Sequence, residues 1–277
     1  MQFPQNCKAT LTDMKEKILS NLNAECPWRD TLHWYDTIPS TNTLAKQLAK
    51  EGAPHGTVLI AGHQTGGRGR MGRTFQSPAG AGVYLSVILR PNCKPTELMH
   101  LTCAAGVAMM DAVESASGIR PQVKWINDLV VGTKKLGGIL TEMSLEKGIV
   151  DYAVIGIGIN CLQRASDFPP EISSMATSLS MIIEKTVLPE VLAAAMTEAL
   201  WKLDAVLFTQ KELLMARYRQ DCITLGKEIQ VIRGDTVLPG KAVDMDDDGG
   251  LLVQYPDGSV QTVSSGEVSV RGMYGYV

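Results

Sequence analysis

Arginine and glycine are concentrated in the short segment GGRGRMGR, which runs from Gly66 to Arg73 directly after an apolar stretch. Arginine offers permanently charged, planar donors for carboxylates and phosphates, and glycine lets backbone amides approach a ligand closely. The segment is therefore suited to bind an acid or a nucleotide phosphate. A flexible basic loop explains the composition equally well. The segment from Gly66 to Arg73 matches a dinucleotide-binding fingerprint poorly, and it lacks the lysine of a Walker A loop.

A second set of polar residues lies in the segment KWINDLVVGTKKLGGIL. If Gly132 and Thr133 form a two-residue hairpin turn, Val130 lies opposite Lys135. Asp128 and Lys135 then become diagonal neighbours on one face, roughly 7–8 Å apart at Cβ. A carboxylate and an amine would converge where a metal-bound nucleotide and an acid can meet. For the pair taken alone, a salt bridge on a solvated face is the simpler interpretation.

Apolar periodicity and turn residues indicate the elements that position these segments. Helices are expected over residues 13–22, 41–52, 97–117, 188–208 and 210–222. Ser40 or Thr41 can cap the second of these helices, and the third is expected to end near Gly118. Strands are expected over residues 32–38, 57–62 and 83–89, and as a series between 122 and 160. Residues 163–178 contain two consecutive prolines and are expected to form a loop. From Gly226 onward, short apolar runs broken by Gly-Asp and Asp-Gly turns predict a small all-β module.

The composition excludes several classes of protein. The chain has 277 residues and a formal net charge of -3, which argues against broad electrostatic binding of nucleic acid. Its six cysteines include no CxxC pair, which favours a reducing compartment. No signal peptide is evident, and no segment is apolar for long enough to cross a membrane. We therefore expect a cytoplasmic protein that binds neither DNA nor a membrane.

Five segments resemble, in order and spacing, the motifs of biotin protein ligases. They are IPSTN, GHQTGGRGRMGRTFQSP, KWINDL, KKLGGIL and GIGIN. The segment SSGEVSVRG near the C-terminus is similar to the tail of that family. The resemblance extends from about residue 33 to the end. It implies an α+β fold in which a mixed sheet with flanking helices is followed by a small SH3-like β-barrel. The implied division is an N-terminal extension (1–30), a biotin- and ATP-binding catalytic domain (31–225) and a C-terminal SH3-like domain (226–277).

The resemblance also implies roles for individual residues. The biotin site would comprise Ser40, Thr41, Asn42, Gln64, Arg68, Gly69, Arg70 and Lys135. The ATP site would comprise Phe75, Asn127, Asp128 and Asn160. The catalytic residues would be Lys135, Arg68, Arg70 and Asp128, with Asp128 near Mg²⁺. Taken singly, these residues are explained as helix caps, turn residues or core residues, but their ordered combination outweighs those interpretations.

The implied reaction has two steps and uses biotin and ATP as substrates. The biotin carboxylate attacks the α-phosphate of ATP, which gives biotinyl-5′-AMP and pyrophosphate. A lysine of a biotin carboxyl carrier protein then attacks the mixed anhydride and releases AMP. Mg²⁺ and the cationic side chains would offset the repulsion between the two anions. No tightly bound prosthetic group is expected, and the resemblance allows a homodimer.

Two departures from the family pattern bear on function. Ile126 stands where many members have proline. Only about 30 residues precede the catalytic pattern, too few for the DNA-binding winged helix of some members, so no DNA binding is expected. Three alternatives remain, namely a lipoate ligase, a biotin-responsive regulator and an inactive scaffold. The intact GRGRMGR and KWIND segments favour biotin, and retention of Lys135 and Asp128 favours an active enzyme.

Overall fold

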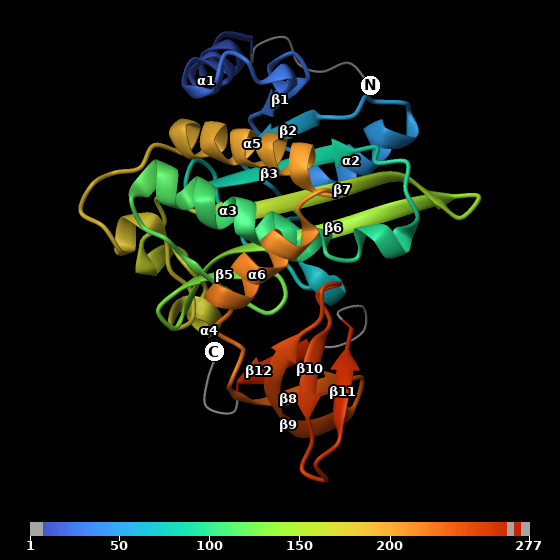
Figure 1. The fold of residues 1–277 in the computed structure, drawn as a ribbon. Coiled ribbons are helices and arrows are strands. Elements are labelled where there is room, and N and C mark those ends of the chain that lie inside the picture. The colour runs from blue at the N-terminus through green and yellow to red at the C-terminus, as the bar shows by residue number, and fades with distance from the viewer. Residues whose placement is uncertain (1–7, 265–268, 273–277) are drawn as a thin grey trace.

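The computed structural model describes residues 8–264 and 269–272, and its larger part is built around a mixed seven-stranded sheet (Figure 1). The strands are β1 (Leu32–Tyr35), β2 (Thr57–Ala61), β3 (Gly82–Leu89), β4 (Gln122–Lys124), β5 (Asp128–Val131), β6 (Lys134–Glu146) and β7 (Ile149–Asn160). Their order in the sheet is β1-β2-β3-β7-β6-β5-β4. β1 and β2 are parallel, and the other neighbouring strands are antiparallel.

Helices cover both faces of this sheet. They are α1 (Lys8–Asn21), α2 (Thr41–Lys50), α3 (Leu101–Ser117), α5 (Pro189–Val206) and α6 (Lys211–Asp221). α2 packs on one face, where Leu59, Ile88 and Val154 are buried. α3 and α5 pack on the other, against the side chains that alternate with these, such as Val58 and Val87. Side chains of a strand alternate between faces, so the buried central strands read as continuous apolar runs.

Short helical turns fill the connections. They are η2 (Pro27–Arg29), η3 (Arg70–Gly72), η4 (Pro95–Leu98), η5 (Ala165–Asp167), α4 (Pro170–Ser173) and η6 (Leu179–Met181). Three of them correct the predicted elements. The helix predicted over 97–117 is split into η4 and α3, although it ends at Gly118 as expected, in the left-handed conformation with φ 77°. The loop predicted over 163–178 contains the single turns η5 and α4.

The N-terminal helix is longer than predicted and belongs to the main core. The prediction covered residues 13–22, whereas α1 begins at Lys8. Ile18 and Leu22 are buried, and α1 packs on α5 and β1. The apolar face of α1 is therefore buried against other elements of the same chain. Among the described residues, no helix combines the length and apolarity needed to span a bilayer.

The hairpin between β5 and β6 has the predicted register at its turn. Val131 pairs with Lys134, and Val130 pairs with Lys135. A bulge between Leu129 and Val130 then shifts the pairing, so that Asp128 lies opposite Gly138. A bulge adds one unpaired residue to a strand and re-aims the side chains beyond it.

The C-terminal module is an antiparallel five-stranded sheet that lies at one end of the molecule (Figure 1). Its strands are β8 (Glu228–Arg233), β9 (Thr236–Met245), β10 (Leu251–Gln254), β11 (Val260–Val263) and β12 (Ser269–Gly272), in the order β11-β10-β9-β8-β12. A mixed sheet with flanking helices followed by a small β module confirms the predicted fold class. The module's buried side chains, including Val231, Leu251 and Val253, join the main core cluster.

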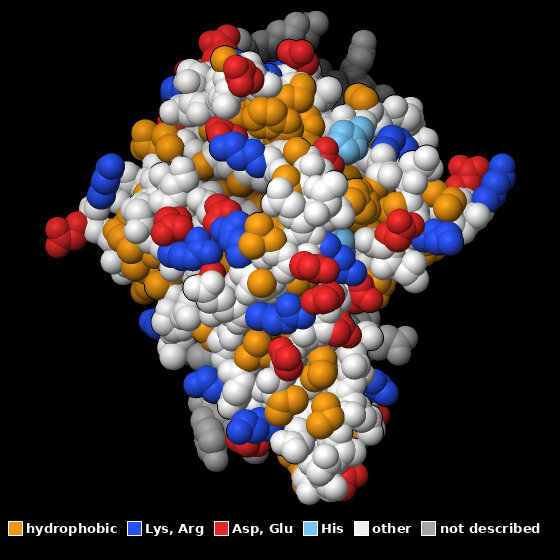
Figure 2. Space-filling model, viewed as in Figure 1, with side chains coloured by type: hydrophobic (Ala, Val, Ile, Leu, Met, Phe, Trp, Pro, Cys, Tyr) orange, Lys and Arg blue, Asp and Glu red, His pale blue; other side chains and the backbone are white. Residues whose placement is uncertain are grey.

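The module docks on the larger part through its β9–β10 loop, residues 246–250. Trp125 donates from Nε1 to the carbonyl oxygen of Gly249 at 2.9 Å. Two ion pairs of 2.5 Å flank this bond, between Arg219 and Asp247 and between Lys211 and Asp248. Figure 2 shows basic and acidic side chains interspersed down this side of the molecule. The acidic loop therefore contacts α6 and the KWIND segment.

Candidate active site

All of the predicted site residues line one open cleft, whose volume is about 550 Å³. They are Ser40, Thr41, Asn42, Gln64, Arg68, Gly69, Arg70, Phe75, Asn127, Asp128, Lys135 and Asn160. They come from the start of α2, the segment after β2, the β5–β6 hairpin and the end of β7. The fold thus brings together residues that are far apart in the sequence.

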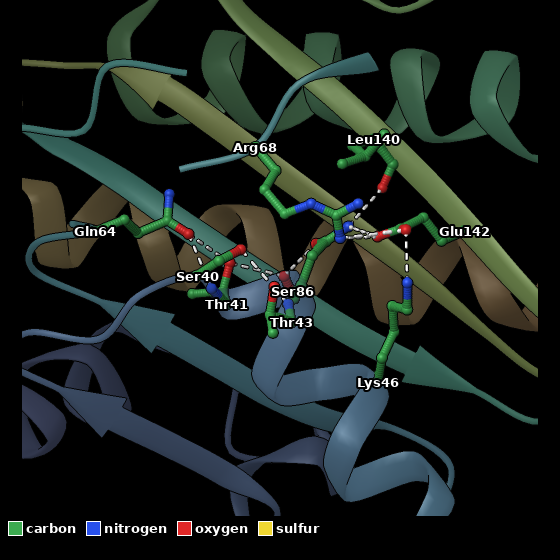
Figure 3. Close-up of polar contacts among 10 residues, drawn as sticks. Ser40, Thr41, Thr43, Lys46, Gln64, Arg68, Ser86, Leu140 and Glu142 are labelled. Atoms are coloured by element: carbon green, nitrogen blue, oxygen red, sulfur yellow. Dashed lines mark hydrogen bonds and ion pairs between the residues drawn. The ribbon is translucent and has the colours of Figure 1, made fainter. Parts of the chain in front are cut away.

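The N-terminus of α2 forms one end of the cleft (Figure 3). Ser40 is the N-cap, and its hydroxyl accepts from the Thr43 amide at 3.5 Å. The Thr41 amide donates to Oε1 of Gln64 at 2.8 Å, and Nε2 of Gln64 donates to Ser77 at 2.9 Å. The predicted cap was Ser40 or Thr41, and the structure assigns it to Ser40. This role is compatible with a place in the cleft, because the cap fixes where the helix begins.

Ser86 connects this end to the sheet and was not among the predicted site residues. Its buried hydroxyl lies 2.8 Å from the Thr41 hydroxyl and 2.6 Å from Oδ1 of Asn42. Gly156 lies beneath, where an added Cβ would be 1.7 Å from the same Oδ1. The signal was a single serine within the apolar strand VYLSVIL. Buried polar groups are normally hydrogen-bonded, so such a serine indicates a buried polar partner.

Glu142 was also missed, and it joins three segments at the same end (Figure 3). Its carboxylate lies 2.8 Å from Nζ of Lys46, 3.1 Å from Nη1 of Arg68 and 3.2 Å from Nδ2 of Asn42. Burial raises the pKa of this carboxyl, but hydrogen bonds from Lys46 and Asn42 outweigh burial, so the net pKa lies below its ordinary value. Glu142 is therefore ionised at neutral pH.

The Gly/Arg loop, residues 66–76, folds as a hairpin above the cleft. Its two arms are joined by a bond of 3.0 Å from the Phe75 amide to the Gly67 carbonyl. At Gly67 an added Cβ would lie 2.3 Å from the Phe75 oxygen, so the close approach of the arms requires glycine. Arg68 reaches Glu142, and Arg70 donates to Oδ1 of Asn127 at 3.3 Å. The loop therefore contacts both ends of the cleft.

The other end of the cleft holds the predicted acid–amine pair. Nζ of Lys135 lies 2.5 Å from Oδ1 of Asp128, and the two side chains are 29% and 18% exposed. The pair thus lies in the cleft wall rather than on a solvated face. Asn127 is fixed by a 2.9 Å bond from Nδ2 to the Ile139 carbonyl. Burial lowers the pKa of Arg70, and the negative charge of Asp128 opposes that shift.

Aromatic and amide groups complete the floor. Phe75 lies on Gly158, where an added Cβ would be 2.4 Å from the ring, and makes an edge contact with Tyr84. Asn160 is buried, and it donates from Nδ2 to the Thr177 carbonyl at 2.9 Å. Its Oδ1 accepts from Gln163 at 3.1 Å. Asn160 therefore holds the segment after β7 against the cleft.

The KWIND turn is supported from behind by three hydrogen bonds. The Tyr218 hydroxyl of α6 donates to the Ile126 carbonyl at 3.0 Å, and the Trp125 amide donates to Thr224 at 2.9 Å. The third bond is the one from Trp125 to Gly249 of the C-terminal module. Asn127 and Asp128 are therefore positioned partly by residues outside the catalytic motifs.

Comparison with known proteins gives a consistent result. Residues 34–160 match the biotin/lipoate A/B protein ligase family, and residues 224–271 match the biotin protein ligase C terminal domain. A "Bifunctional ligase/repressor BirA" of Bacillus subtilis is 35% identical over 243 residues, which cover 86% of this chain and 74% of the relative. A "Biotin--[acetyl-CoA-carboxylase] ligase" of Mycobacterium tuberculosis is 34% identical, with 83% and 85% covered.

A solved structure supports the same grouping. The biotin protein ligase of Aquifex aeolicus in complex with biotin and ATP superposes with a TM-score of 0.72 at 32% identity, covering 87% of this chain and 99% of that one. The fold and the cleft thus define a biotin/lipoate-type protein ligase. Within that class, the chain belongs to the biotin protein ligases, as the resemblance predicted.

Proposed function

We propose that biotin binds at the α2 end of the cleft, that ATP binds at the KWIND end, and that the two react between them. The observation that carries this assignment is the path of the Gly/Arg loop, whose Arg68 and Arg70 contact opposite ends of one cleft. An anion that joins the two substrates would lie beneath both guanidinium groups. Both predicted substrates are thereby given a place.

The first step brings two anions together, the biotin carboxylate and the α-phosphate of ATP. The biotin carboxylate attacks the α-phosphate of ATP, a P–O bond forms, and pyrophosphate leaves. Lys135 lies in the cleft wall beside Asp128, and its ammonium would lower the repulsion between the two reacting anions. Arg68 and Arg70 would act in the same way from above. The hairpin above the cleft would also exclude water from the anhydride.

The residues at the KWIND end fit a magnesium ion that arrives with its nucleotide. Among the described residues, no cluster of three His, Cys, Asp or Glu side chains could hold a metal ion by itself. Mg²⁺ commonly takes one or two protein carboxylates together with substrate phosphates, and Asp128 supplies one such carboxylate. When bound, the ion would neutralise phosphate charge.

The second step requires an acceptor lysine. Its amine attacks the carbonyl carbon of the mixed anhydride, the C–O bond to AMP breaks, and an amide to biotin results. We propose a biotin carboxyl carrier protein as the acceptor, which agrees with the name of the Mycobacterium tuberculosis relative. The Bacillus subtilis relative is named a "Bifunctional ligase/repressor". For this chain we propose the ligase role alone, because α1 packs on α5 and buries Ile18, so that this face of α1 is not available to DNA.

One experiment tests the reaction and its substrate together. The chain is incubated with biotin, MgATP and a biotin carboxyl carrier domain, and the intact mass of the carrier is measured. A single biotinyl addition that depends on ATP is expected, with excess lipoate failing to compete. Addition of a lipoyl group instead would overturn the assignment of biotin.

A further inference from the structure

Glu142 lies on β6, the strand that also carries Lys135, and seven residues separate the two. Leu140, which lines the cleft, and Glu142 are two residues apart on this strand, so their side chains point to the same face of the sheet. The Glu142 carboxylate is the point where α2 and the Gly/Arg loop meet (Figure 3). The strand thus places the cation Lys135 in the cleft wall and the anion Glu142 behind Arg68 and Asn42, which line the other end.

The contact between Glu142 and Arg68 can hold the loop while it uses only one nitrogen of the guanidinium group. Nη1 of Arg68 lies 3.3 Å from Oε1 and 3.1 Å from Oε2 of Glu142. Within the described residues these contacts use Nη1 alone, which leaves Nε and Nη2 of Arg68 available to an anion in the cleft. The side chains of Arg68 and Glu142 are 44% and 20% exposed, so water screens the pair only in part.

We propose that Glu142 is a positioning residue, which fastens Arg68 and thereby keeps the Gly/Arg loop closed over biotinyl-AMP. The inference rests on the proposed function. Glu142 acts through Arg68 and does not touch the reacting atoms. Its neighbours Lys46 and Asn42 fix the carboxylate, so that the loop closes on a group that is already in place. Retention of the adenylate is the step that depends most on Glu142, because loss of the contact frees the loop but leaves the charge of Arg68 in place.

The test compares E142Q with wild type and with E146Q, an exposed position on the same strand. Glutamine preserves the shape and one acceptor oxygen but removes the charge. Loss of a partly exposed charge-assisted bond predicts that biotinyl-AMP leaves the enzyme about fivefold to tenfold faster. Labelling of bulk lysines on an unrelated protein should rise by a similar factor. Adenylate formation should be reduced less than retention, because the unfastened Arg68 keeps its charge, and E146Q should match wild type throughout.

A double variant shows whether Glu142 acts through Arg68. If it does, E142Q adds no further release in an R68Q background, because the contact is already lost. Independent, additive effects would overturn the proposal, as would an E142Q enzyme that retains the adenylate as wild type does but binds biotin more weakly.

Trypsin susceptibility of the loop separates this inference from the proposed function. Cleavage after Arg68, Arg70 or Arg73 should be faster in ligand-free E142Q than in ligand-free wild type. If wild type forms no biotinyl-AMP while this difference is seen, the proposed function fails and the fastening contact stands. Equal cleavage rates would refute the contact itself, whatever the activity.

Discussion

At the α2 end of the cleft, Thr41, Asn42 and Ser86 are buried and bonded to one another, whereas at the KWIND end Asp128 and Lys135 form an ion pair that stays partly exposed. A buried and satisfied network holds a fixed shape, because breaking any bond leaves a polar group without a partner. A partly exposed ion pair can be rearranged at low cost. The first end is thus suited to recognise a ligand, and the second to respond to the charges of reacting groups.

The largest expected effect concerns the charged end. Lys135→Ala removes a cation from the reacting anions, so biotin-dependent pyrophosphate release should fall by roughly 10²–10³, as for other preorganised electrostatic groups. Because the side chain is partly exposed, the free energy of unfolding should change by only about 1 kcal/mol or less. Steady-state assays and denaturant unfolding measure the two quantities. Near-normal pyrophosphate release would show that Lys135 is only a structural partner of Asp128.

The Gly/Arg loop contacts both ends of the cleft. Loss of its contact at one end should therefore weaken the retention of biotinyl-AMP. Arg70→Gly deletes the contact with Asn127. Biotinyl-AMP should then leak to bulk lysines about tenfold faster, because a hydrogen bond involving a charged group is lost.

We also expect the wild-type loop to be protected from protease by biotin and ATP together. Equal cleavage with and without ligands would contradict the predicted ordering of the loop.

Ser86→Ala probes the buried network at the α2 end. It removes the hydroxyl that lies between Thr41 and Asn42, and buried groups left without partners cost roughly 1–3 kcal/mol. The dissociation constant for biotin should therefore rise about tenfold, while that for ATP stays unchanged. Calorimetric titration of each ligand provides the measurement. Equal weakening of both ligands would mean that the two ends are not independent.

The smallest expected effect concerns the C-terminal module. Trp125→Phe deletes the bond to Gly249 and keeps most of the packing, so the KM for ATP should rise only about fivefold, as expected for one net hydrogen bond. Trp201→Phe on α5 is a control of the same chemical kind. A normal KM for ATP in the Trp125 variant would indicate that the module does not support the nucleotide end.

Local features of the site could be predicted from the order of the amino acids. A two-residue turn at Gly132 and Thr133 fixes the hairpin register, so the approach of Asp128 to Lys135 was predictable. Ser40 was predictable as a helix cap, and Gly118 as a helix end. Each of these depends on residues a few positions apart, whose conformations are restricted by local sterics and hydrogen bonding. The ordered motifs identified the predicted residues, and the fold brings all of them into one cleft.

The contacts that hold the two ends of the cleft could not be predicted from local sequence. The bonds of Glu142 join residues that are 74, 96 and 100 positions away, and no local pattern marks such a partner. The bond from Trp125 to Gly249 spans 124 positions, so the acidic loop could not be assigned to a surface from its composition. The bulge after Leu129 brought Asp128 opposite Gly138 instead of Gly137. Contacts of this range depend on how whole elements pack, because burial and polar pairing are settled only when the layers meet.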